Sequence, residues 1–221
     1  MITLVLEAST YAGSVALLDG STLLGERSVA MRGKEHEALM PAVAELLGEC
    51  GRSAREIERV VCGAGPGSFT SLRIAGAIAK GIALSSGASL VPVSSLALLV
   101  AARDPLVPGR YIATADAMRG ERYGQEFEVA ADGAISAVGG LSLIPSATAG
   151  PMADARGAVA LGPTGPGVEL AEPHARGAAL LTNMIDSAGP ADLAAWEPRY
   201  GRLAEAQVKW EAEHGRPLQP G

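Results

Sequence analysis

The 221-residue sequence is poor in several features, and each shortage argues against a class of function. Aromatic residues make up only 4% of the chain although 48% is hydrophobic, so the core has to consist of Ala, Val, Leu and Ile. The net charge is −6 and no long run of Lys or Arg occurs. Because non-specific nucleic-acid affinity comes mainly from neutralised phosphates, we do not expect the chain alone to bind nucleic acid. The N-terminal segment MITLVLEAS lacks the basic region of a signal peptide and is too short to span a bilayer.

Disulfide and metal-binding patterns are missing as well. Cys50 and Cys62 are the only cysteines, which suits a reducing compartment better than a disulfide framework. The histidines His36, His174 and His214 are isolated from one another, so no zinc site of familiar spacing is expected. These absences predict a cytoplasmic protein with no metal site and no membrane association.

The first half of the chain alternates between β-rich and helical patterns. Asp19–Gly20 is a hairpin signal, and Ser53 with Glu56 has the spacing of a capping box. The order predicts a mixed sheet with helical crossovers. The expected elements are strands at 2–7, 13–19 and 21–29, a helix at about 39–50, a strand at 59–65, a helix at 68–85, a strand at 89–93 and a helix at 95–102.

The second half begins after a plausible domain boundary. The segment 104–109 holds two prolines and a glycine, which favour a connecting loop. Beyond it, 110–117 and 122–130 have the pattern of strands in a second sheet, and 158–162 is a weaker strand. An amphipathic helix is predicted over 201–214. The intervening region is rich in Gly, Ala and Pro and supports no prediction.

The stretch GPGSFTSLRIAGAIAKG places a glycine-rich loop before a helix, as in many phosphate sites. Gly63, Gly65 and Gly67 are spaced by two and Ser68 replaces the third glycine of a dinucleotide fingerprint, while Lys80 is too distant for a Walker loop. Free amides at the start of the helix can still bind an anion. The alternative, which we favour, is that the glycines supply unusual dihedral angles and close packing. The candidate anion-binding residues are Ser9, Thr10, Gly65, Gly67 and Ser68.

The helix at 68–85 is apolar nearly all the way round. Ile74, Ile78 and Ile82 form a ridge at i, i+4 and i+8, while Arg73 and Lys80 share a narrow polar strip. Such a helix is normally buried on two sides. The preceding helix also has a small, apolar outer side. The pattern leaves two alternatives open, because another subunit or the second domain could cover these helices.

Two carboxylates stand at strand ends. Glu7 and Asp116 occupy positions that can hold a metal-bound phosphate in two-domain kinases. A single carboxylate in such a place is more often a cap or a turn residue. No base can be paired with Ser68, Ser94 or Ser95, so the sequence assigns no catalytic residue.

Five segments in the same order carry a resemblance to a known family. They are LVLEASTYAGSVALL, KEHEALMPAVAELL, GAGPGSFTSLRIAGAIAKGIA, PVSSLALL and ADAMRGERYGQEF, of which the third is the most specific. They resemble the TsaB (YeaZ) family of bacterial tRNA threonylcarbamoyladenosine (t6A) synthesis. The resemblance covers roughly the first 130 residues well.

This resemblance implies an α/β fold of the actin-like, sugar-kinase-like (ASKHA) type. It comprises two RNase H-like domains with mixed sheets and helical crossovers. The first domain spans 1–103 and is joined by the helix at 201–214, and the second spans 104–200.

The resemblance also implies a catalytically inactive paralogue of a TsaD-like transferase. The chain would bind that catalytic subunit, with a TsaE-like ATPase as a further partner and tRNA reached only through the complex. ATP or ADP would bind only at the joint surface, and the chain alone would form homodimers. The interface would be a helical bundle made by the two helices of the first domain, so that Ile78→Asp breaks the complex. Its residues would be His36, Met40, Ala44, Leu72, Arg73, Ile74, Ala77, Ile78 and Ile82.

Three positions depart from the family pattern. Glu7 stands where an aspartate is usual, and its extra methylene argues against nucleotide chemistry. Ser71 and Ala75 stand where glycines are usual and would tune how closely a partner helix approaches. An actin-like ATP-dependent phosphotransferase and a glycoprotease-like peptidase are the alternative functions.

Overall fold

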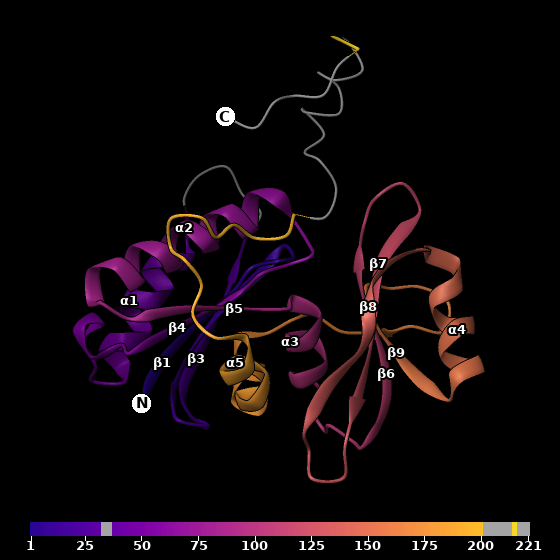
Figure 1. The fold of residues 1–221 in the computed structure, drawn as a ribbon, viewed down its shortest axis with the longest axis horizontal. Coiled ribbons are helices and arrows are strands. Elements are labelled where there is room, and N and C mark those ends of the chain that lie inside the picture. The colour runs from indigo at the N-terminus through magenta and orange to yellow at the C-terminus, as the bar shows by residue number, and fades with distance from the viewer. Residues whose placement is uncertain (32–36, 201–213, 216–221) are drawn as a thin grey trace.

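The computed structural model describes residues 1–31, 37–200 and 214–215, which contain two five-stranded sheets (Figure 1). His36 and nearly all of the helix predicted over 201–214 lie outside the described residues. Within the described part, no helix is long and apolar enough to cross a membrane.

The first sheet is mixed, as predicted. Its strand order is β3-β2-β1-β4-β5, with the first three strands antiparallel and the last two parallel to β1. Every residue of strands β1 and β4 is buried, as a central pair covered on both faces requires. The strands are β1 (Ile2–Glu7), β2 (Ala12–Asp19), β3 (Thr22–Ala30), β4 (Arg59–Gly63) and β5 (Ser89–Val93).

Two helices cover the outer face of this sheet. Helix α1 (Leu39–Glu49) packs on β2 and β3, and α2 (Phe69–Ser86) packs on β4, β1 and β5. Helix α1 starts at Leu39, as Pro41 in the first turn predicts, and its inward side buries Val43 and Leu46. Each fully buried leucine contributes roughly 1.5–3 kcal/mol.

The second sheet repeats the order of the first. Read from the opposite edge it is β8-β7-β6-β9-β10, again three antiparallel strands followed by two parallel ones. Two sheets of one order confirm the predicted α/β fold with two RNase H-like halves. The elements are β6 (Gly109–Asp116), β7 (Glu121–Val129), β8 (Ile135–Pro145), η2 (Ser146–Thr148), α4 (Ala149–Arg156), β9 (Ala158–Gly162) and β10 (Glu169–Leu170).

A central layer lies between the two sheets. It consists of α3 (Ser95–Ala101), η3 (Ala175–Leu180) and α5 (Thr182–Ala188). One hydrophobic cluster runs through this layer, from Val5 and Val61 of the first sheet to Tyr111 and Phe127 of the second. Figure 1 shows α1 and α2 at one end of the molecule and α4 at the other. The second sheet therefore packs on the central layer, away from α1 and α2.

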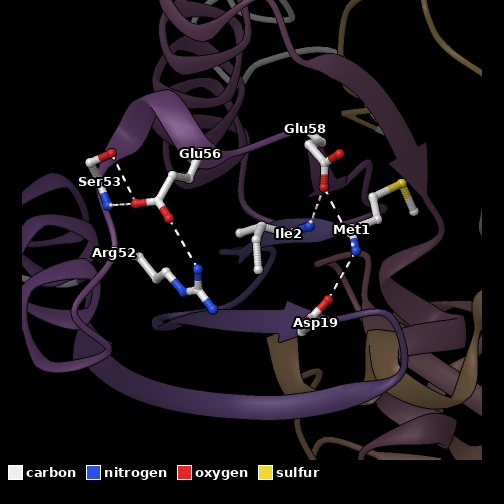
Figure 2. A network of polar contacts seen from close by, with 7 residues as sticks. All are labelled: Met1, Ile2, Asp19, Arg52, Ser53, Glu56 and Glu58. Atoms are coloured by element: carbon white, nitrogen blue, oxygen red, sulfur yellow. Dashed lines mark hydrogen bonds and ion pairs between the residues drawn. The ribbon is translucent and has the colours of Figure 1, made fainter.

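The N-terminus is tied by polar contacts to the strands on either side of β1 (Figure 2). The Met1 amine lies 2.9 Å from the Asp19 carboxylate and 3.7 Å from that of Glu58. The backbone N–H of Ile2 donates to Glu58 at 2.7 Å. The hydrogen bond with Asp19 raises the pKa of the amine, so its charge is retained at neutral pH.

A one-turn helix, η1 (Ala54–Glu56), precedes β4 and carries the predicted capping pair. The Glu56 carboxylate accepts from the Ser53 N–H at 2.7 Å and from the Ser53 hydroxyl at 3.0 Å. Arg52 donates to the other Glu56 oxygen at 3.0 Å, which Figure 2 also shows. The backbone bond from Ser53 lowers the pKa of Glu56.

Candidate partner-binding surface

The outer side of α1 carries small and apolar side chains. Met40 is 44% exposed, and Pro41, Ala44 and Gly48 are exposed beside it. The charged residues of this helix stand toward β3, where Arg27 forms ion pairs with Glu45 and Glu49. The other exposed residues of α1, Met40, Pro41, Ala44 and Gly48, are uncharged.

The outer side of α2 continues this surface. Ala77 and Gly81 are exposed, and Leu84 is 77% exposed one turn further on. Ile74 and Ile78, on the same helix, are half-buried. We call Met40, Pro41, Ala44, Gly48, Ile74, Ala77, Ile78, Gly81 and Leu84 the helix-pair surface.

Two residues of the predicted interface lie in the core instead. Leu72 is completely buried, and Ile82 is only 6% exposed within the cluster beneath α2. The interface prediction is therefore corrected at these positions. The physical reason is that each step of four residues rotates a side chain by about 40° around a helix. The isoleucine ridge thus winds inward by Ile82.

The family departures on α2 also point inward. Ser71 is 4% exposed and Ala75 is completely buried, so neither lies on the helix-pair surface. The Ser71 hydroxyl lies 3.0 Å from that of Ser68 at the start of the helix. The prediction that both residues tune the approach of a partner is corrected, because they pack within this chain.

A segment from the end of the described chain crosses α2. The backbone N–H of Ala191 donates to Leu90 in β5 at 2.8 Å, and that of Arg199 donates to Ala64 at 2.7 Å. Residues 190–200, here called the strap, therefore return to the first sheet, although they fall within the range predicted for the second domain. Figure 1 shows the strap in orange passing over α2.

The side chains of the strap cover one flank of α2. A Cβ on Gly76 would lie 3.2 Å from Pro198 and 3.6 Å from Trp196, so a larger residue there would press on the strap. The Lys80 ammonium stands 5.9 Å from the centre of the Trp196 ring. The strap thus seals this flank and leaves the helix-pair surface uncovered by the described residues.

Aromatic contacts hold the beginning of α2 in the same way. The rings of Phe69 and Tyr200 are 4.7 Å apart, and the Arg73 guanidinium lies 5.2 Å from the centre of the Phe69 ring. Both cations of the polar strip therefore lie near aromatic rings, Arg73 beside Phe69 of α2 and Lys80 beside Trp196 of the strap. This arrangement keeps positive charge at the margin of the helix-pair surface.

The glycine-rich loop is packed against the turn between β1 and β2. The Ser68 N–H donates to the Ser9 carbonyl at 2.7 Å, and a side chain at Gly67 would collide with that carbonyl. The Thr10 hydroxyl bonds to Ala12 in its own turn. Gly65 has φ of +85° beneath the Arg199 carbonyl. These contacts support the packing interpretation of the loop over the anion-binding one.

Glu7 is enclosed at the end of β1. Its carboxylate is completely buried and accepts from the Ser9 N–H at 2.5 Å and from the Ser95 hydroxyl at 2.8 Å. Burial raises the pKa of Glu7, although these hydrogen bonds oppose the shift. Burial likewise raises the pKa of the neighbouring Cys62 thiol. The carboxylate is thus committed to internal hydrogen bonds.

Asp116, at the corresponding end of β6, is exposed. Its carboxylate accepts the Met118 N–H at 2.8 Å and so caps the turn before β7. Within the ranges 1–31, 37–200 and 214–215, no group of three or more His, Cys, Asp or Glu side chains could hold a metal ion.

Comparison with known proteins identifies the family to which the chain belongs. Residues 31–146, just over half of it, match the family model described as TsaD: tRNA N6-adenosine threonylcarbamoyltransferase. The chain belongs to the TsaD family. A solved structure of the same architecture, YeaZ from Pseudomonas aeruginosa, is 27% identical with a TM-score of 0.75. The match covers 90% of this chain and 99% of that one.

The curated relatives that match the chain include TsaB proteins. The tRNA threonylcarbamoyladenosine biosynthesis protein TsaB of Bacillus subtilis is 33% identical over 56% of this chain and 53% of its own length. Its Escherichia coli namesake is 34% identical over 58% of this chain and 55% of its own length. The chain therefore spans about half the length of the curated relatives it matches. The resemblance to TsaB and YeaZ predicted from the sequence is confirmed.

Proposed function

We propose that this chain takes part in t6A synthesis as a non-catalytic subunit that binds a TsaD-like catalytic subunit. The similarity to TsaB proteins of tRNA threonylcarbamoyladenosine biosynthesis supports the pathway. The helix-pair surface supports the mode of binding. A TsaE-like ATPase is the proposed further partner in the cytoplasm, and tRNA is reached through the assembled complex.

The observation that carries this proposal is the chemistry of the helix-pair surface. Ala44 and Gly48 on α1, and Ala77 and Gly81 on α2, expose no side chain larger than a methyl group. Small residues let a partner's helices come close, while Met40 and Leu84 supply apolar area at the ends. Contiguous exposed apolar surface marks interaction sites. A stable interface would bury about 1,200–2,000 Å² in total.

The non-catalytic role rests on the two sites that could have bound a nucleotide. The Glu7 carboxylate already accepts hydrogen bonds from Ser9 and Ser95, and the Ser68 N–H already donates to the Ser9 carbonyl. We therefore propose that ATP or ADP binds only at the surface shared with a partner. Calorimetry of the isolated chain with ATP and magnesium is expected to give no binding at micromolar concentration, whereas the alternative phosphotransferase would bind tightly.

The interface is best tested at Ala77. Ala77→Asp places a charge in the centre of the helix-pair surface without removing any core contact, because Ala77 is exposed. Ile78→Asp is a poorer test, since Ile78 also packs against the core cluster. Ala155→Asp is the matched control, because Ala155 is an exposed alanine of α4 at the far end of the molecule.

The measurement is the dissociation constant of each variant with the TsaD-like protein of the same organism. We expect Ala77→Asp to weaken binding about tenfold or more, which is about 1.4 kcal/mol, and Ala155→Asp to bind like the wild type. Equal binding by both variants would place the interface elsewhere. The same surface should form the proposed homodimer, so Ala77→Asp should be monomeric by light scattering.

A further inference from the structure

The chain passes from the second sheet back to the first through residues 171–180, here called the junction, which follow β10 and include η3. After β10, η3 packs against α3 and against β1, β2 and β3 of the first sheet. The Ala175 N–H donates to the Ser14 hydroxyl at 2.9 Å, and the Arg176 guanidinium donates to the Ala102 carbonyl at 3.1 Å. This junction therefore fixes the returning chain on the face of the first sheet that meets the second.

His174 is placed at the start of this junction with both ring nitrogens engaged. Its Nδ1 accepts the backbone N–H of Arg176 at 3.2 Å, which caps η3. Its Nε2 lies 3.0 Å from the Ser28 hydroxyl of β3. Because Nδ1 accepts, the proton of the neutral ring must sit on Nε2, which then donates to Ser28. Neutral His174 thus joins η3 to the edge strand of the first sheet.

Two charged groups face the imidazole. Glu26 on β3 lies 3.6 Å from Nδ1, and Arg176 on η3 lies 3.5 Å from the other oxygen of Glu26. Burial lowers the pKa of His174, and the attraction of Glu26 only partly opposes this effect while Arg176 adds to it. The surroundings therefore favour the neutral ring.

We propose that His174 is a proton-sensitive latch that fastens the junction when neutral and loosens it when protonated. A second proton would bind to Nδ1, where it would face the Arg176 N–H, so that two donors oppose each other and the cap is lost. The charged ring would turn toward Glu26 and compete with Arg176 for its carboxylate. The junction would then lose the cap on η3 and the geometry of the Ser28 contact.

The sign of the pH effect follows from the direction of the shift. The pKa of His174 lies below its ordinary value of 6.5 in the folded protein, so the unfolded chain binds the proton more readily. The latch contributes fully above pH 6.5 and its contribution falls as the pH drops toward the folded pKa. Below that value the stability contribution falls no further, while the population of the neutral, capping ring drops about tenfold with each pH unit.

The test is amide hydrogen exchange of Arg176 in the full chain, compared between about pH 7.5 and about pH 5 after correction for intrinsic rates. We expect protection to fall severalfold in the wild type. His174→Asn should keep a constant protection, because asparagine caps a helix without titrating. His214→Asn is the control variant and should behave like the wild type.

A second measurement does not depend on any variant. The ring resonances of His174 should titrate below pH 6.5 in the wild-type chain, together with the amide of Arg176. A midpoint at or above 6.5, or parallel exchange profiles for the wild type and His174→Asn, would overturn the proposal.

Discussion

The two sheets share a strand order but differ in how their fourth and fifth strands are joined. The first sheet uses α2, a helix of 18 residues, whereas residues 163–168 join β9 to β10 without a helix. Parallel neighbours normally need a crossover of a dozen residues or more. The short link supports a strand of only two residues, and its Leu170 is 73% exposed. The strand order therefore does not require α2, which points to a separate role for that helix.

The outer layers of the two sheets differ in the same direction. Under α1 and α2 lies an extensive cluster that includes Leu4, Leu46 and Ile82. Under α4 the buried cluster consists of Ile112, Ala153 and Ala160 alone among the described residues. The first sheet thus has the more extensive covered face and still has apolar surface on the outside of its helices, which is the surface that our proposal assigns to a partner.

The largest expected effect on the free energy of unfolding tests whether α2 is anchored more firmly than β10. Leu72→Ala should destabilise the protein by about 2–5 kcal/mol, because Leu72 anchors α2 in the core. Leu170→Ala should cost less than about 0.5 kcal/mol, since the side chain is already exposed. Urea denaturation followed by circular dichroism gives both values, and similar costs would mean that α2 is no better anchored than β10.

A smaller effect, on the pH dependence of stability, should distinguish Glu7 at the end of β1 from Asp116 at the end of β6. Because burial raises the pKa of Glu7 above 4.5, the folded chain gains stability as the pH falls from neutral through that pKa. Glu7→Gln should remove this gain, each unit of pKa shift being about 1.4 kcal/mol. Asp116→Asn should keep the wild-type slope, because Asp116 is exposed. Unfolding between about pH 8 and about pH 5 checks both, and equal slopes for the wild type and Glu7→Gln would contradict the burial argument.

The smallest effect concerns the N-terminal ion pair of the first sheet. Asp19→Asn should lower the melting temperature only slightly, since exposed ion pairs contribute little. The raised pKa of the Met1 amine means that this contribution is present below pH 8 and disappears as the pH rises further. A scan of melting temperature against pH should therefore show the two proteins converging at alkaline pH.

Much of the first sheet could be predicted because its elements obey a clear period. The strand at 89–93 and the helix beginning at Leu39 agree with the prediction, and the contacts of the glycine loop are those expected of a packing device. In the second sheet, β8 and α4 gave no usable signal. Strand β8 has eight consecutive exposed residues, 136–143, so no alternation exists to be recognised. Helix α4 contains Gly150 and Pro151, which favour a loop.

The assignment of the candidate surface to a partner stays a prediction, and the sequence could not say which residues of α2 are exposed. A helix apolar all round gives no unique inward direction, so the pattern could not separate buried Leu72 from exposed Ala77. The strap was missed for a different reason. Trp196 and Pro198 contact Gly76 across more than a hundred residues of sequence, and no local period reports such a contact.

The strap also sets an order of events during synthesis. A ribosome releases α2 long before Trp196 and Pro198, because β5, α3 and the whole second sheet lie between them in the chain. Until then the flank of α2 beside Gly76 has no cover. Helix α2 is thus made early but acquires its mature exterior only after the strap has been made. A binding protein that touches Ala77 and Trp196 together would distinguish a chain made at least to residue 200 from a shorter one.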